Sequence, residues 1–193
     1  MLYQKYKATG FARKFKHRRY LRIIHALGIS PPASVLEIGC ANGADFIRFA
    51  LADGFTCHGV DLAKLERLCD FQFTQADAQK LPFKDNAFDA VVSIGVLEHI
   101  PVQELCRVTA EMARVSKRSC TIVPAVSTPI EPHTLSLLWS IRSKKKACPY
   151  PLYFYSDETW KTFPGLATAQ TERFWYMPGF HNLMITNSMP VHR

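Results

Sequence analysis

Short apolar runs alternate with amphipathic segments along most of the chain, and this pattern predicts the secondary structure. Buried parallel strands appear as short continuous apolar runs, whereas surface helices repeat their apolar residues every three to four positions. The predicted strands lie at residues 34–38, 56–60, 71–75, 87–94, 120–125, 171–177 and 181–186. The predicted helices lie at residues 10–27, 44–52, 64–69 and 102–115, with a short one from residue 156 through Phe163.

The order of these elements predicts one α/β domain. Strands that alternate with helices form a mostly parallel sheet with both faces covered. The last two strands turn through Pro178-Gly179, so we expect the last strand to be antiparallel. We expect residues 1–30 to form a basic helical segment packed on a domain of residues 31–193, in which residues 126–155 form a substrate-side insertion.

The positive charge of the chain is concentrated at its N-terminal end. The 24 Lys and Arg residues exceed the 16 Asp and Glu residues by 8, and residues 1–36 contain eight basic residues and no acid. The predicted helix at residues 10–27 therefore has an apolar face and a cationic face. The cationic face is either simply solvated or attracts an anionic substrate, a nucleic acid or lipid headgroups.

Several classes of protein are excluded or disfavoured by composition. No run of about 18 apolar residues is long enough to span a bilayer, and the basic N-terminus is not followed by the apolar core of a secretion signal. We therefore expect a cytoplasmic protein. The six cysteines form no C-x-x-C pair, so we expect reduced thiols in the core and no metal site.

The segment Glu37 to Gly43 connects a buried strand to a helix through a glycine-containing turn. Such a turn lets the backbone approach a ligand closely. A nicotinamide dinucleotide motif requires glycine at positions 41 and 44, and both are Ala, which argues against a dehydrogenase. Asp61 ends the second strand, where a carboxylate can accept both ribose hydroxyls, and Asp77 ends the third, where it can accept from an adenine amine.

The chain resembles the class I S-adenosylmethionine-dependent methyltransferases of methyltransferase type 11 over residues 33–125. The matching motifs are E-I-G-C-A-N-G from Glu37, the acid Asp61, A-D-A-x-x-L-P-F at residues 76–83, F-D-x-V-V-S followed by L-E-H-I, and E-M-A-R-V-S-K at residues 111–117. The resemblance implies a Rossmann-like, doubly wound fold and S-adenosylmethionine as cofactor.

The resemblance also implies roles for individual residues. Around the methionine part it places Gly39, Ala41 and Gly43, with Glu37 beneath and Ser93 near the methionyl end. Around the nucleoside it places Asp61 on the ribose, Leu62 beside the adenine, and Asp77 with the Ala78 N–H on the adenine edge.

A sulfonium methyl group is already activated, so a dedicated catalytic residue is optional. If the acceptor is a hydroxyl or an acidic carbon, a base must remove a proton, and the candidates are His99, Glu98 and His133. We expect methyl transfer to a small or lipid-linked acceptor, with contact to an anionic membrane surface as a further hypothesis. The alternatives are an RNA or protein methyltransferase guided by the basic segment, and a scaffold without catalytic activity.

Overall fold

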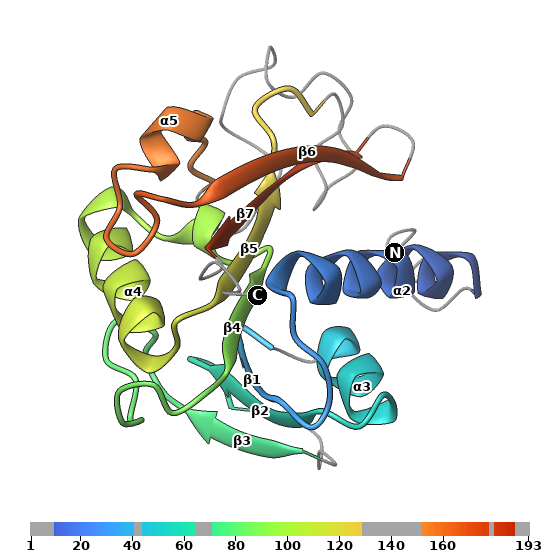
Figure 1. Ribbon diagram of the computed structural model, residues 1–193. Helices are drawn as coiled ribbons and strands as arrows, with labels where there is room; N and C mark the ends of the chain where they lie inside the picture. The colour runs from blue at the N-terminus through green and yellow to red at the C-terminus, as the bar shows by residue number, and fades with distance from the viewer. Residues whose placement is uncertain (1–9, 41–43, 65–70, 129–151, 178–179, 188–193) are drawn as a thin grey trace.

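The computed structural model describes residues 10–40, 44–64, 71–128, 152–177 and 180–187. Seven strands form one sheet in the order β3-β2-β1-β4-β5-β7-β6 (Figure 1). Their bounds are β1 Ser34–Ile38, β2 Thr56–Asp61, β3 Gln72–Gln75, β4 Ala90–Ile94, β5 Ser119–Pro124, β6 Gln170–Met177 and β7 Phe180–Asn187. The first five strands pair in parallel, which confirms the predicted doubly wound sheet.

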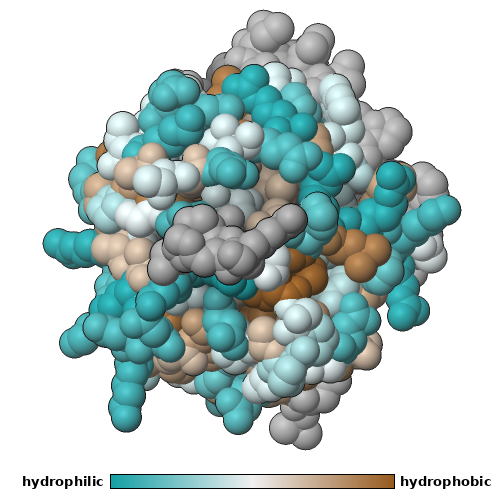
Figure 2. Space-filling view, in the orientation of Figure 1, coloured by the Kyte–Doolittle hydropathy of each residue, from teal (hydrophilic) through white to brown (hydrophobic). Residues whose placement is uncertain are grey.

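Helices cover both faces of the sheet. Their bounds are α2 Gly10–Leu27, α3 Asp45–Ala52, the 3-10 helix η1 Leu97–His99, α4 Val102–Val115 and α5 Asp157–Trp160. One apolar cluster joins α2 and α3 to the sheet, and a second joins α4 and α5 to the opposite face. Figure 2 shows that hydrophilic side chains cover most of one side of the molecule, as expected when the apolar residues fill two such layers.

Helix α2 has the bounds that its sequence predicts. Tyr20, Ile23 and Leu27 are buried at helical spacing against the sheet and α3, whereas the basic residues lie mainly on the outer side. The helix ends at Gly28, whose φ of 59° is in the left-handed region that terminates helices. None of the helices in the described ranges is long and apolar enough to cross a membrane.

The C-terminal hairpin pairs with the sheet through its second strand, β7, and not through its first strand, β6. Strand β7 lies between β5 and β6 and pairs antiparallel with both, so the predicted antiparallel last strand is confirmed and is internal. Strand β6 forms the edge. This arrangement places the first residues of β7 beside the carboxyl end of β5, since Pro124 is in register with Asn182.

Three predictions are wrong in detail. The short helix predicted through Phe163 ends at Trp160, because Pro164 disfavours helical backbone at the residue before it. Strand β4 begins at Ala90, three residues later than predicted, because the Asp89 side chain accepts hydrogen bonds from the N–H and hydroxyl of Ser34 and holds the preceding residues in a turn. Cys106 is exposed and is not a core thiol, because it lies beside the buried stripe of α4 that contains Leu105. Cys40, Cys57 and Cys120 are buried as predicted.

Some predictions fall outside the described residues. They concern the helix at residues 64–69, whose positions 65–70 are not described, most of the insertion at residues 126–155, and the cysteines Cys69 and Cys148.

Candidate functional site

The carboxyl ends of four neighbouring parallel strands lie at one edge of the sheet. Ile38 of β1 is in register with Val60 of β2 and with Ser93 of β4, and Asp61 is in register with Gln75 of β3. The polar residues predicted from sequence therefore lie along one edge, where ligands bind in open parallel sheets. The described residues brought together there are Glu37, Gly39, Asp61, Leu62, Asp77, Ala78, Ser93, Glu98 and His99.

The turn after β1 requires glycine at position 39. Gly39 has a φ of 73°, and its N–H donates to the Val60 carbonyl at 2.7 Å. A Cβ atom at this position would lie 2.2 Å from Cγ2 of Val96, so the backbone of the turn passes directly against the loop after β4. The turn residues Ala41 and Gly43 lie outside the described residues.

Glu37 is a buried carboxyl group beside this turn. Glu37 is only 6% exposed. Burial raises the pKa of its side chain from 4.5 to about 8, while Arg19 and the N–H of Ile47 act to lower this pKa. Oxygen Oε2 has no hydrogen-bond partner among the described residues. Because an unpaired buried carboxyl oxygen is costly, its position favours a missing polar or cationic partner.

The ends of β2 and β3 are tied together by hydrogen bonds. The N–H of Ala76 donates to the Asp61 carbonyl at 3.0 Å, and the Gln75 side chain donates to the Leu62 carbonyl at 3.0 Å. Each acid also closes a local turn, since Asp61 Oδ1 accepts from the N–H of Ala63 and Asp77 Oδ1 accepts from the N–H of Gln79. Both carboxylates are thereby held in fixed orientations.

The surroundings of these acids differ in exposure. Asp61 and Ala78 are half-buried, and Asp77 is exposed. Leu62 is 72% exposed and leaves an apolar surface beside Asp61. The edge of the sheet therefore offers an apolar side chain between polar groups, which suits a flat heterocycle attached to a sugar.

Two further buried polar groups lie at or after the end of β4. Ser93 is fully buried, and Glu98 in η1 is 1% exposed, so that burial raises the pKa of Glu98 from 4.5 to about 8. Ser93 Oγ, Glu98 Oε2 and the neighbouring Thr121 Oγ1 on β5 lack hydrogen-bond partners among the described residues. Unpaired buried oxygens thus occur on β1, β4 and β5 and in η1.

Of the two histidines predicted as possible bases, the structure describes His99 but not His133. His99 is half-buried, and its backbone N–H donates to the Val96 carbonyl at 2.9 Å at the start of η1. Glu98 precedes it, and the Glu98 carbonyl accepts from the N–H of Tyr153 at 2.7 Å.

A third histidine, missed by sequence reasoning, lies at the same edge of the sheet. His181 Nδ1 is 2.6 Å from Ser127 Oγ, and the ring stacks on Trp175 with centroids 4.7 Å apart. The His181 N–H donates to Thr128 Oγ1, and its carbonyl accepts from the N–H of Ala125. Ser127 and His181 are 54 positions apart in the chain. They meet because β7 pairs with β5, and no local sequence pattern predicts that pairing.

Comparison with known proteins finds similarity to methyltransferases over the part of the chain that contains this edge. Residues 36–123 match the family model described as a methyltransferase domain. The sterol 24-C-methyltransferase ERG6B of Gibberella zeae is 34% identical over 114 residues, which cover 53% of this chain and 29% of that protein. Norajmaline N-methyltransferase of Rauvolfia serpentina is 32% identical over 104 residues, which cover 48% and 35% of the two chains.

A solved structure shares the fold over nearly the whole chain. The 1,6-didemethyltoxoflavin-N1-methyltransferase of Burkholderia thailandensis, solved with S-adenosylhomocysteine bound, has a TM-score of 0.65 and 18% identity and covers 95% of this chain and 82% of its own. The aligned region spans only about a third of the length of the two curated relatives above.

Proposed function

We propose that this protein transfers a methyl group from S-adenosylmethionine to a small or lipid-linked acceptor. The match of residues 36–123 to a methyltransferase domain supports the proposal, as do the class I motifs of the sequence. When bound, this cofactor supplies a methyl group that is already activated on a sulfonium. The task left to the protein is to hold the two reactants in line and to exclude water.

The observation that carries the proposal is that the buried carboxyl group of Glu37 lies beside the Gly39 turn. Its oxygen Oε2 has no hydrogen-bond partner among the described residues, so a cationic group suits this place. The methionyl amine of S-adenosylmethionine has that charge. We assign the methionine part to Glu37, Gly39, Ala41, Gly43 and Ser93.

The remaining residues of the edge suit the nucleoside. Asp61 lies at the end of β2, is half-buried, and has its carboxylate oriented by the N–H of Ala63, so it suits the ribose hydroxyls as an acceptor. Leu62 offers an apolar surface for the adenine. Asp77 and the N–H of Ala78 are proposed to bind the adenine edge. These assignments rest on the position of each group at the carboxyl edge of the sheet and on the family motifs.

Two groups are suited to the acceptor side. His99 follows β4, and His181 lies two strands away, beyond the end of β5, at roughly 10 Å across the sheet. In the tautomer in which Nδ1–H of His181 donates to Ser127 Oγ, Nε2 is the nitrogen that can receive a proton from an acceptor hydroxyl. The exposed Trp175 ring beside it suits a ring-shaped or apolar acceptor, in line with the sterol and alkaloid named for the relatives.

The cofactor assignment is tested by calorimetric titration of S-adenosylhomocysteine. We expect Asp61→Ala to abolish measurable binding without loss of the folded state, because it removes the acceptor of the ribose hydroxyls. Glu158→Ala, at an exposed acid in α5, is the matched control and should bind normally. Unchanged affinity in Asp61→Ala would contradict the assignment.

The acceptor side is tested by transfer of isotopically labelled methyl groups to fractionated acceptor pools. We expect His181→Gln to lower the rate at least about tenfold near neutral pH for a hydroxyl acceptor while S-adenosylhomocysteine affinity stays unchanged. A rate lowered only in His99→Gln would assign the base to His99. Cofactor binding with no labelled product from any pool would favour the scaffold alternative, and product confined to RNA or protein would replace the small acceptor.

A further inference from the structure

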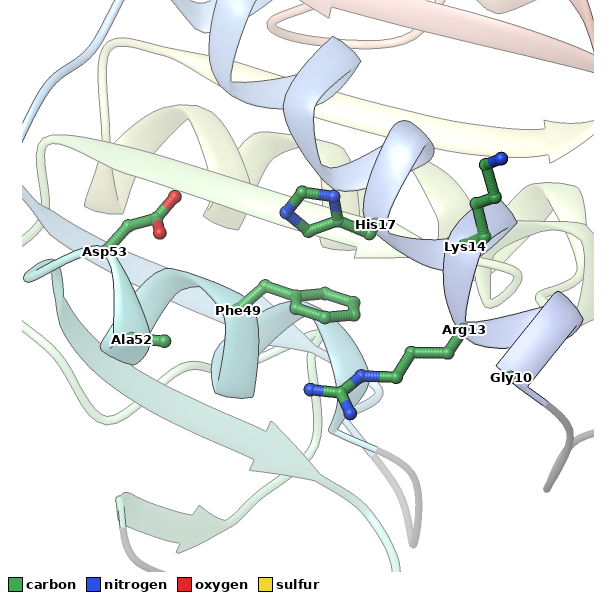
Figure 3. A pocket seen from close by; sticks show the side chains of 7 residues that line it. All are labelled: Gly10, Arg13, Lys14, His17, Phe49, Ala52 and Asp53. Atoms are coloured by element: carbon green, nitrogen blue, oxygen red, sulfur yellow. The ribbon is translucent and has the colours of Figure 1, made fainter.

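A cavity lies between α2 and α3, on the helical layer that covers one face of the sheet. Its volume is about 460 Å³, within the range of small-molecule sites. Arg13, Lys14 and His17 line it from α2, and Phe49 and Asp53 line it from α3 and its end. Figure 3 shows the Arg13 side chain extending toward α3, whereas the Lys14 side chain points away from α3. None of these five residues belongs to the strand edge described above.

The cations of α2 divide into two groups. Three of them bind other parts of the protein, since Lys16 pairs with Asp45 at 2.7 Å, Arg22 pairs with Glu172, and Arg19 lies over the Tyr176 ring. Arg13 and Lys14 are exposed and form no ion pair with any residue in the described ranges. The same holds for Arg18, so two of the three Lys and Arg residues of α2 that are unpaired within the described ranges, Arg13 and Lys14, line the cavity.

The cavity also contains an acceptor. The Tyr20 hydroxyl donates to Asp53 Oδ2 at 2.6 Å, and Oδ1 makes no hydrogen bond to the described residues. A carboxylate would repel a bare anion but would accept a hydrogen bond from a ligand hydroxyl. Phe49 adds an aromatic surface, held by an edge contact with His17 at 5.0 Å between centroids.

We propose that this cavity binds a phosphate ester that carries a hydroxyl group, with the phosphate on Arg13, the hydroxyl on Asp53 and the carbon skeleton against Phe49, while Lys14 adds positive charge at the rim. Guanidinium and ammonium groups are the usual phosphate ligands, and the bonds they make are charge-assisted. Two sources share this chemistry, namely a free sugar or glycerol phosphate and the headgroup of a phospholipid such as phosphatidylglycerol.

The charge surrounding the cavity favours this class of ligand. Arg18 and His25 are exposed on the same outer side of α2. Among the α2 residues whose burial the structure describes, Leu21 is the one large apolar residue that is exposed, at 48%, so these residues offer no broad apolar face for insertion into a bilayer. A polar phosphate ester is the ligand that fits these surroundings.

The test is titration of the full chain with glycerol 3-phosphate, followed through the backbone amide resonances of residues 10–17 and 49–53. We expect Arg13→Gln combined with Lys14→Gln to weaken binding at least about tenfold. The control combines Lys84→Gln with Lys117→Gln, two exposed lysines near the opposite ends of the strands, and lowers the net charge by the same amount. Because neither lysine lines the cavity, this control should change affinity less than about twofold. Equal weakening in both double variants, or no shift of these resonances, would overturn the site.

The second arm distinguishes the sources. A lipid headgroup would be identified if the protein floats with vesicles that contain phosphatidylglycerol but not with vesicles of pure phosphatidylcholine. The Arg13 and Lys14 double variant should then no longer float. Saturation by glycerol 3-phosphate without flotation would identify a free ester. Asp53→Asn should reduce the preference for glycerol 3-phosphate over inorganic phosphate. Tighter binding of a short oligouridylate, with loss in the same variant, would replace the proposal with a nucleic-acid surface.

Discussion

At Gly39 the backbone adopts a left-handed conformation and lies against the side chain of Val96. Two separate effects therefore exclude a side chain, namely the conformation and the missing space. The sequence indicates the first effect, because a glycine after a buried strand is typical of such turns. The second depends on Val96, which is 57 positions away in the chain, and only the pairing of β1 with β4 brings the two residues together.

We expect Gly39→Ala to lower the free energy of unfolding by about 2–4 kcal/mol, because it combines a left-handed alanine with overpacking. Adding Val96→Ala should restore the packing part and leave the conformational part. Urea denaturation of the two single variants and the double variant measures both. Additive losses would show that the two positions do not interact, contrary to the contact described above.

Helix α2 is joined to the domain by packing and by a buried polar contact. Tyr20 packs edge-on against Phe46 at 5.6 Å between centroids, and its hydroxyl donates to Asp53. Burial, together with this bond to Asp53, raises the pKa of the Tyr20 hydroxyl above its ordinary range, so the group remains a donor in ordinary buffers. The helix acts as part of the layer that covers the sheet.

We expect Tyr20→Phe to cost about 1 kcal/mol of unfolding free energy, because it removes one hydrogen bond and keeps the ring. Tyr20→Ala should cost about 3–5 kcal/mol, because it also leaves a cavity beside Phe46. Chemical denaturation of both variants separates the two contributions. Equal losses in the two variants would mean that the hydroxyl alone attaches the helix.

At the scale of elements, the sequence predicts most bounds because local rules determine them. The apolar stripe of α4 and the end of α2 at Gly28 follow from periodicity and from glycine chemistry. The start of β4 does not, because the Asp89 bonds to Ser34 join residues 55 positions apart. The contact between His181 and Ser127 is likewise invisible in sequence, since it depends on β7 lying beside β5.

Across the whole molecule, two buried carboxyl groups make stability depend on pH. Burial raises the pKa values of Glu37 and Glu98 from 4.5 to about 8, so both bind a proton in the folded state at neutral pH but release it on unfolding. The folded state therefore binds more protons between about pH 4.5 and 8. By linkage, the free energy of unfolding falls as pH rises through this interval.

We expect each carboxyl to contribute a slope of up to about 1.4 kcal/mol per pH unit. Glu37→Gln and Glu98→Gln should each flatten the curve and raise stability at pH 8 relative to the unchanged chain, with little gain at pH 4.5. Urea denaturation across this interval measures the slope, and Glu158→Gln is the exposed control. A curve as steep in both buried variants as in the unchanged chain would contradict the buried, protonated state.

The internal position of β7 has a consequence for synthesis on the ribosome. Until residues 180–187 have left the exit tunnel, β5 has no partner on one side and the aromatic residues of β6 have no strand to pair with. A nascent chain can assemble the first five strands early, yet it keeps an unpaired, aggregation-prone sheet edge until β7 has emerged from the ribosome. Chaperone dependence should therefore be greatest for nascent chains in which β6 has emerged and β7 has not.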